Sequence, residues 1–170
     1  DIDPMVKPIL VGPHDLVVGS RSLGGSDELV GNFSRFIRIT GSHIITLGIN
    51  YRYGVVLTDS QNGFRAIRTS LGRAIKLQEK ITTAEQEMLS KSLHVGGRVT
   101  ETQSHEYKRR FGESCINVRI VWFRYVYSWL KYLIFTGLKK NSYHPPKGNL
   151  LIVSEVEPMK KPAPATHLQT

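Results

Sequence analysis

Short apolar runs alternate with segments of helical periodicity along this chain, and this alternation constrains the fold more than any other feature. Residues 15–19 (DLVVG) and 55–57 (VVL) have the length and apolar character of buried strands. Between them, apolar residues recur at helical spacing from Leu29 to about Leu47. Helices that alternate with short buried strands predict an α/β fold, a sheet with helices on its faces.

The remaining elements before residue 107 follow from capping and turn residues. A short helix is expected over residues 1–11, and residues 20–28, rich in Gly and Ser, predict a mobile loop. A capping box, Thr82 or Thr83 followed by Glu85 or Gln86, predicts a helix that runs to Val95 and stops at Gly96 and Gly97. Residues 63–68 should be extended, and the polar segment 98–107 predicts an edge strand.

The last third of the chain divides into a helix and a tail. A helix is expected from Ile116 to about Leu138. Residues 139–170 hold five of the eight prolines, so we expect an irregular tail that contributes little to the fold. The sequence thus predicts a folded portion over residues 1–138 and a Pro-rich tail.

Length and cysteine content narrow the class of protein. A chain of 170 residues favours one domain and can bury enough surface to fold without disulfides or a structural metal. Its lone Cys115 excludes an intramolecular disulfide framework and a multi-cysteine zinc site. No run of about 18 uncharged apolar residues is present, which argues against a membrane-spanning helix. The chain shown begins with Asp1 and carries no secretory signal pattern.

The formal net charge of +9 is concentrated in one region. Nine basic and three acidic residues lie between Arg98 and Lys140, so this region carries +6 of the total. Such an excess indicates an anionic partner: nucleic acid, a membrane surface or a phosphorylated substrate. No zinc-finger, helix-turn-helix or RNA-recognition signature accompanies it, so we do not expect nucleic acid to be the partner.

The same region contains the most aromatic stretch of the sequence, residues 121–135. At helical spacing, Asn117, Arg124, Ser128 and Lys131 form one narrow polar stripe on an otherwise apolar helix. This pattern suits an amphipathic helix in the interfacial region of a bilayer, where aromatic rings lie at headgroup depth. The residues predicted to contact the membrane are Trp122, Arg124, Trp129 and Lys131. The alternative is a core-facing helix whose cationic side chains extend to water.

Four short segments place an arginine beside Gly or Ser: residues 19–21, 32–35, 58–65 and 107–114. In open α/β sheets, ligands bind beyond the carboxyl ends of the strands. The forked donors of arginine match phosphate oxygens, so several converging arginines would form a phosphate or pyrophosphate site. Each arginine taken alone could equally be a surface residue or part of a structural salt bridge.

In this order, the segments resemble family-2 glycosyltransferases of the dolichyl-phosphate mannose synthase type. The resemblance covers about residues 1–135. It rests on a strand ending in Gly-Ser-Arg, the loop Asp-Ser-x-x-Gly-Phe-Arg, the helix that contains residues 85–89, and Arg-x-x-Gly-x-Ser before the amphipathic helix. It implies part of a GT-A fold and transfer of mannose or glucose, with inversion, from a nucleotide-sugar to a dolichyl or polyprenyl phosphate at the cytoplasmic face of a membrane.

By match of motif, the resemblance also implies roles for individual residues. The catalytic candidates are Asp59, Glu85 and Glu87. The candidates for binding phosphate or substrate are Arg21, Arg35, Gln61, Arg65, Arg109, Arg110 and Ser114. Because a lipid phosphate is largely ionised near neutral pH, Asp59 is expected to hold a sugar hydroxyl or an arginine rather than to act as a base. Alternatively, Asp59 caps the turn at Asn62 and Gly63, and Glu87 is a solvated helix residue.

Two departures from the family pattern limit the resemblance. Cys115 stands where the family usually has Lys, which removes one phosphate contact. The nucleotide-binding half, with the Asp-x-Asp pair that holds a divalent metal (Mg or Mn), is expected upstream of Asp1, so no metal ligand is assigned in this chain. The chain would then represent the acceptor half of the enzyme. The competing prediction is a non-catalytic basic module for membrane surfaces, or a split subunit that needs a partner.

Overall fold

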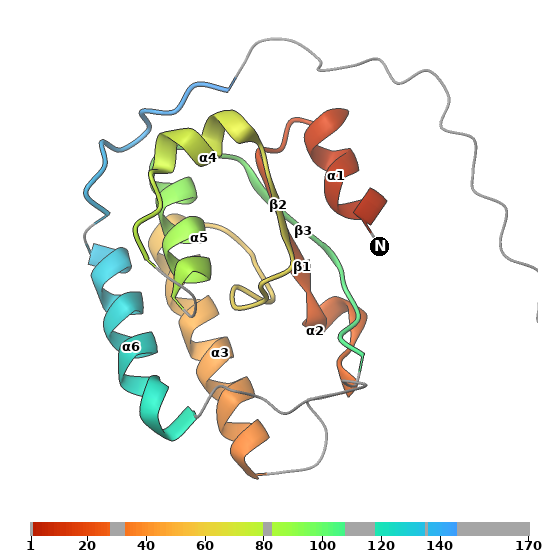
Figure 1. The fold of residues 1–170 in the computed structure, drawn as a ribbon, viewed down its shortest axis with the longest axis vertical. Helices are drawn as coiled ribbons and strands as arrows, with labels where there is room; N and C mark the ends of the chain where they lie inside the picture. Colours follow the sequence, from red (N-terminus) through yellow and green to blue (C-terminus); the bar gives the residue numbers. More distant parts are fainter. Residues whose placement is uncertain (1, 28–32, 80–82, 108–117, 135, 146–170) are drawn as a thin grey trace, which may run out of the picture.

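The computed structural model describes residues 2–27, 33–79, 83–107, 118–134 and 136–145, which form a mixed α/β fold around a three-stranded sheet (Figure 1). The strands are β1 (Leu16–Ser20), β2 (Arg65–Ile67) and β3 (Val99–Gln103), in the order β2-β1-β3. β1 pairs antiparallel with β2 and parallel with β3. The expected edge strand within residues 98–107 is confirmed, as is the extended segment within 63–68.

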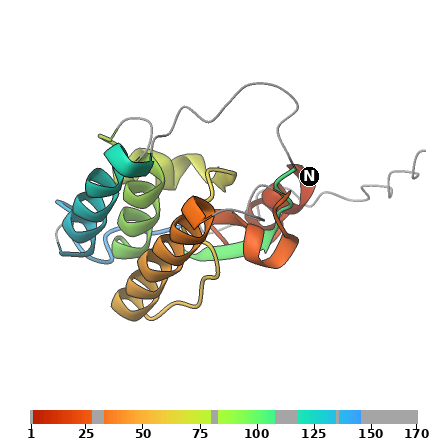
Figure 2. The same cartoon turned by 90° about the horizontal axis from the view of Figure 1, so that it is seen from below.

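Six helices surround this sheet in the described part of the chain. They are α1 (Ile2–Leu10), α2 (Arg21–Gly24), α3 (Phe33–Tyr53), α4 (Thr69–Ile75), α5 (Ala84–His94) and α6 (Val118–Ile134). Figure 2 shows α1 on one side of the sheet and α3, α5 and α6 on the other. β1 is buried along its whole length between these layers, which explains its uninterrupted apolar run.

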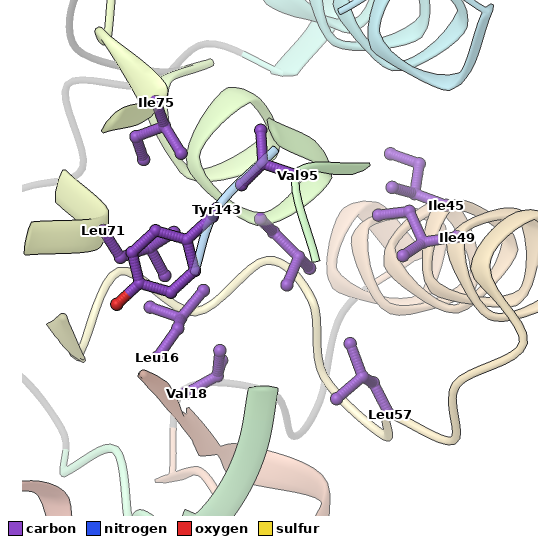
Figure 3. Packing of buried hydrophobic residues seen from close by; sticks show 10 residues of the cluster. Leu16, Val18, Ile45, Ile49, Leu57, Leu71, Ile75, Val95 and Tyr143 are labelled. Atoms are coloured by element: carbon purple, nitrogen blue, oxygen red, sulfur yellow. The ribbon is translucent and has the colours of Figure 1, made fainter. Parts of the chain in front are cut away.

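Alternate side chains of β1 supply the two cores. Val17 packs with Met5 and Ile9 of α1. Leu16 and Val18 point to the opposite face, where α3, α4 and α5 contribute half of the buried residues of the larger cluster (Figure 3). Members of that cluster from these helices include Ile45, Ile49, Leu71, Ile75 and Leu89. Because successive side chains of β1 point to opposite faces of the sheet, this one strand packs against both layers of helices.

Residues 55–57 were expected to form a buried strand, and this prediction is wrong. Val56 is 91% exposed, Leu57 is buried in the larger core cluster, and Val55 packs against that cluster while only partly buried. The Asn50 side chain accepts from Leu57 N at 3.0 Å and donates to Leu57 O at 2.8 Å. A helix side chain therefore satisfies the backbone groups that a neighbouring strand would otherwise pair.

Several predicted boundaries also change. The described part of 20–28 contains the short helix α2, because the buried Ser20 hydroxyl caps it by accepting from Leu23 N. α3 continues past Leu47 to Tyr53. The capping box is wrong, since the Thr83 side chain accepts no hydrogen bond from the backbone of its own helix, and its hydroxyl donates to Glu79. α5 does stop before Gly96, whose positive φ of 91° suits glycine.

The start of the tail contributes to the core, contrary to expectation. Residues 136–145 are irregular, but Tyr143 is only 9% exposed and belongs to the larger cluster. Its backbone N–H donates to Val95 O, and its hydroxyl lies 3.0 Å from Ser70 Oγ. Proline content therefore predicted the irregular conformation of this segment but not its packing.

Candidate functional site

The carboxyl ends of the parallel strands β1 and β3 meet at one edge of the sheet, beside α2 and the loop 58–64 (Figure 1). Ser20 ends β1 opposite Gln103 of β3. Arg21 is the first residue of α2, which begins directly where β1 ends. The loop is tied to this edge because Asn62 Nδ2 donates to Gly19 O at 2.8 Å. Residues far apart in sequence are thereby brought to the strand ends.

Arg21 and Asp59 form the central contact of this region. Arg21 Nε lies 2.6 Å from Asp59 Oδ2, Arg21 Nη2 lies 3.1 Å from Oδ1, and the Arg21 backbone N–H also donates to the carboxylate. Asp59 is 3% exposed. Burial disfavours its charged form, but the hydrogen bonds and charge of Arg21 outweigh burial and lower the pKa of Asp59. Asp59 is therefore an ionised partner of an arginine and a weak base.

Asp59 also shapes the turn that follows it. Its Oδ1 accepts from Gln61 N at 3.0 Å, as in an Asx turn. The structure therefore shows Asp59 holding an arginine, and it caps a turn at Gln61 rather than the expected one at Asn62 and Gly63. Glu106 lies on the other side of the guanidinium, with Oε2 3.5 Å from Arg21 Nη1.

Arg65 supports the loop rather than facing an open site, so its predicted role in binding phosphate is corrected. Its guanidinium donates to three backbone carbonyls, those of Ser60, Asn62 and Glu85, at 2.6 to 2.8 Å. Desolvation lowers the pKa of Arg65 to about 10, which leaves it charged near neutral pH. Arg65 therefore fastens the loop to the first turn of α5.

Two glutamines continue this connection. Gln61 Nε2 donates to Ser60 Oγ at 2.9 Å, and Gln61 Oε1 accepts from Gln86 Nε2 at 3.0 Å. Gln86 is 1% exposed. Gln61 lies beside Asp59, whereas Gln86 was expected only as a capping residue, because its position in the first turn of a helix gives no sign of a contact with Gln61.

The two candidate glutamates of α5 have different surroundings. A Cβ on Gly63 would lie 3.5 Å from Glu85 Oε1, so the Glu85 carboxylate borders the loop. Glu87 is fully buried and accepts from Gln78 N, Glu79 N and Lys91 Nζ. None of these groups belongs to the Asp59 cluster. Glu87 is therefore a structural residue, and both its predicted catalytic role and the solvated alternative are wrong.

Four of the predicted phosphate ligands cannot be placed. Arg109, Arg110 and Ser114 lie outside the described residues, and so does Trp122 as a side chain. Arg35 falls within α3, but its side chain is likewise outside the description. The contact between Arg21 and Asp59 is thus the part of the predicted convergence that the structure places.

The orientation of α6 differs from the predicted polar stripe. Ser128 is 3% exposed and faces inward together with Tyr132. Trp129 packs against the core, with its ring over Gly48 of α3, and Lys131 pairs with Glu79 at 2.8 Å. Trp129 is therefore not the outward residue that was expected, whereas Arg124 is exposed and the Lys131 side chain, paired with Glu79, is 38% exposed.

An apolar side of α6 faces outward instead. Its exposed residues are Phe123, Val126, Tyr127, Leu130 and Ile134. On the neighbouring helix α3, Ile44, Leu47 and Tyr51 are exposed at helical spacing. An open depression of about 300 Å³ lies on α3 beside Thr58, lined by His43, Thr46, Leu47, Asn50, Leu57 and Thr58.

Glu101 of β3 is a site residue that sequence reasoning missed. Its carboxylate accepts from Thr58 N, Thr58 Oγ1 and Asp59 N at 2.7 to 2.9 Å. The available signal was an acidic residue within an expected edge strand, next to the buried strand β1. Polarity alone could not show that this side chain holds a distant loop.

The described cluster has more carboxylates than cations. Arg21 and Arg65 are accompanied by four acidic residues, Asp59, Glu85, Glu101 and Glu106. A phosphate group would therefore require further cations from elsewhere in the chain. Within the described ranges, no three His, Cys, Asp or Glu side chains are grouped as metal ligands.

Fold and site together define a mixed α/β protein with a small mixed sheet and a polar cluster at its strand ends. Comparisons with family models, with curated proteins and with solved structures gave no match. Among the described helices, none combines the length and apolar character needed to cross a membrane.

Proposed function

We propose that this chain is the acceptor-side part of a family-2 glycosyltransferase with a GT-A fold, similar to dolichyl-phosphate mannose synthases. It would help move mannose or glucose from a nucleotide-sugar to a polyprenyl or dolichyl phosphate, with inversion, at the cytoplasmic face of a membrane. The observation that carries this proposal is the contact between Arg21 and Asp59 at the strand ends. These two residues come from separate motifs of the resemblance, and ligands of open α/β sheets bind at such edges.

The proposed reaction is a single displacement. A phosphate oxygen of the lipid attacks the anomeric carbon of the sugar, the bond from that carbon to the nucleotide diphosphate breaks, and the diphosphate leaves with the bonding electrons. The second pKa of a phosphate monoester is about 6, so the nucleophile is already largely ionised near neutral pH. Asp59, with its lowered pKa, is not needed as a base.

The chain's own task would be to bring two anions together and to stabilise the leaving diphosphate. Asp59 fixes the orientation of Arg21 by binding Nε and one Nη2 hydrogen, which leaves other guanidinium N–H groups for a phosphate oxygen. Because the described cluster is rich in carboxylates, we assign the additional cations to Arg35, Arg109 and Arg110. Ser114 would add a hydroxyl donor, and Glu85 would face the sugar.

The divalent metal that the resemblance implies, Mg or Mn, would neutralise the diphosphate in the complete enzyme. The described residues offer no ligand set for it. No step of the proposal is therefore assigned to a metal bound by this chain.

The exposed apolar residues of α6 and α3 favour a membrane as the surface where the acceptor is met. Aromatic residues such as Phe123 and Tyr127, together with exposed cations such as Arg124, suit the boundary between headgroups and acyl chains. A lipid phosphate is presented at that depth. The membrane contact would therefore be made by the residues on the exposed side of α6 together with Arg124 and Lys131, and not by Trp129, which packs against the core.

The test is a set of substitutions in the complete enzyme. Arg21→Ala, Arg109→Ala and Asp59→Asn should each lower sugar transfer to a polyprenyl phosphate by at least about tenfold, because each removes or misplaces a phosphate-binding cation. Transfer would be measured with radiolabelled nucleotide-sugars and extraction of the lipid product.

Arg73→Ala is the matched control, since Arg73 is exposed on α4 at the other end of the sheet (Figure 1). Its transfer rate should equal that of the unsubstituted protein. Unchanged transfer in all three site variants would overturn the glycosyltransferase proposal. Retained vesicle binding in a complete protein without any transfer would favour the non-catalytic membrane module.

A further inference from the structure

The carboxylate of Glu101 has an arrangement that the proposed reaction does not use directly. Both of its oxygens are engaged. Oε2 accepts from Thr58 N at 2.7 Å and from Thr58 Oγ1 at 2.9 Å, and Oε1 accepts from Asp59 N at 2.8 Å. A side chain on the edge strand β3 thus holds two successive backbone N–H groups of the loop that presents Asp59.

The hydroxyl groups around Glu101 form a chain with a fixed direction. Thr58 donates its only hydroxyl hydrogen to Glu101. In the 2.6 Å hydrogen bond between the hydroxyls of Ser20 and Thr58, Ser20 must therefore be the donor. The Ser20 oxygen in turn accepts from Leu23 N in α2. Donation therefore runs from the first turn of α2 through Ser20 and Thr58 to Glu101.

Both ends of the central ion pair depend on this arrangement. Asp59 projects from the backbone that Glu101 holds, and Arg21 is the first residue of the helix that Ser20 caps. We infer that Glu101 is a positioning residue, which fixes the guanidinium of Arg21 against the carboxylate of Asp59 without touching substrate. This inference rests on the proposed function only in assigning a catalytic purpose to the aligned Arg21.

The chemistry requires a carboxylate at this position. All three partners of Glu101 are donors, so the NH₂ group of a glutamine would face at least one of them and lose its hydrogen bond. The position is half-buried and lies outside both hydrophobic clusters. Replacement by glutamine therefore changes the hydrogen bonds of the loop with little change in apolar packing.

The first experiment measures the geometry and needs no substrate. The side-chain Nε–H signal of Arg21 would be followed by NMR in the full chain and assigned through its loss in Arg21→Lys. Glu101→Gln should increase the exchange of this proton with water by about tenfold or more, because its hydrogen bond to the Asp59 carboxylate weakens.

A matched pair of substitutions at Thr58 isolates the hydroxyl chain. Thr58→Val keeps the shape of the side chain but removes the link and should reproduce the faster exchange. Thr58→Ser keeps the hydroxyl and should leave the exchange as it is in the unsubstituted protein. This pair keeps the inference testable if Glu101→Gln fails to fold, and unchanged exchange in the Thr58→Val variant, or in a folded Glu101→Gln variant, would overturn it.

The second experiment is a double-mutant cycle on sugar transfer in the complete enzyme. If Glu101 acts through Asp59, then Glu101→Gln and Asp59→Asn together should cost little more than Asp59→Asn alone. In Glu101→Gln, the KM for the nucleotide-sugar should change less than kcat, because Glu101 does not touch substrate. Fully additive losses would show that Glu101 acts independently of Asp59 and would contradict the inference.

The two experiments separate this inference from the proposed function. Faster Arg21 exchange in a complete protein that has no transfer activity would leave the positioning role intact and refute the glycosyltransferase. Slow Arg21 exchange retained in folded variants of an active transferase would support the glycosyltransferase proposal and refute the positioning role of Glu101.

Discussion

At the scale of single residues, two buried carboxylates lie near opposite ends of β1, and each is paired with arginine. Asp59 holds Arg21 beyond the carboxyl end of β1. Asp15, which is fully buried just before β1, lies 3.0 Å from Arg68 Nε and 2.8 Å from Arg98 Nε. The hydroxyl of Tyr143 donates to the same carboxylate. Asp15 thus joins the sheet, the start of α4 and the segment after α6.

Asp15 should make stability depend on pH in the acid range. Burial opposes its ionisation, but the hydrogen bonds from Arg98 and the charges of both arginines outweigh burial and lower the pKa of Asp15 from its ordinary 3.8. A lowered pKa contributes stability that is fully present above the ordinary value and is lost as the pH falls through the folded value. The unfolding free energy, measured with urea, should therefore fall progressively as the pH drops below about 5.

Asp15→Asn should remove this part of the pH dependence and reduce stability near neutral pH by about 3 kcal/mol, since it leaves the mostly buried guanidinium of Arg68 without a carboxylate, whereas Arg98, 43% exposed, remains in contact with water. Asp3→Asn, on the exposed side of α1, is the control and should cost less than about 1 kcal/mol. If the unfolding free energy of Asp15→Asn fell as steeply at acid pH as that of the unsubstituted protein, Asp15 would not be the source of this pH dependence.

The residue scale also shows the limit of motif reasoning. Arg21 and Asp59 could be selected because they follow a strand and open a turn. Arg65 has an equally suggestive sequence position, yet its partners are backbone carbonyls, which look alike in every sequence. The structural role of Glu87 is hidden in the sequence for the same reason, because two of its three partners are backbone N–H groups.

At the scale of elements, the contact between α3 and α6 depends on a glycine. A Cβ on Gly48 would overlap the indole ring of Trp129. Arg52 and Tyr53 of α3 also donate to carbonyls near the end of α6, those of Leu133 and Tyr132. The helical periodicity of residues 121–135 predicted that a helix exists here. Only the close approach at Gly48 decides that Trp129 turns inward.

Gly48→Val should therefore displace α6 and lower stability by about 1–3 kcal/mol, as overpacking of a helix contact does. The midpoint of thermal unfolding should fall, and tryptophan fluorescence should shift to the red as the Trp129 indole becomes more exposed to water. Gly41→Ala in the same helix is the matched control, because a Cβ there meets nothing within 4 Å. It should raise stability by up to about 1 kcal/mol through helix propensity. Equal effects at the two positions would show that α6 does not pack on α3 as described.

At the scale of the whole molecule, charge and exposed apolar surface coincide. The net charge is +9, and exposed Arg124, Lys139 and Lys140 accompany the apolar side of α6. Single exposed apolar residues are ordinary in proteins, but a row along one helix indicates a contact surface. Composition located the charge, whereas the direction in which α6 faces came from its packing.

The protein should float with vesicles that contain phosphatidylserine, and added salt should weaken this binding. The triple substitution of Phe123, Leu130 and Ile134 by Ser should lower the partition coefficient at least about tenfold, since it removes apolar area from the bilayer contact. Substitution of Ile2, Val11 and Leu23 by Ser removes exposed apolar residues at α1 and α2, away from α6, and should leave partitioning unchanged. Equal flotation of the two triple variants would refute the assignment of the surface to α6.

The sequence by itself determined the α/β class, the positions of most helices, β1, the edge strand β3 and the place of Arg21 at a strand end. These features follow from local periodicity and from residues that adjoin strand ends. The tertiary structure alone decided that residues 55–57 are not a strand, that Arg65 and Glu87 support the backbone, that Tyr143 enters the core and that Glu101 holds the Asp59 loop. Each of these depends on contacts that local patterns do not encode. Backbone carbonyl and N–H groups are alike at every position, so the sequence does not show which side chain will bind them.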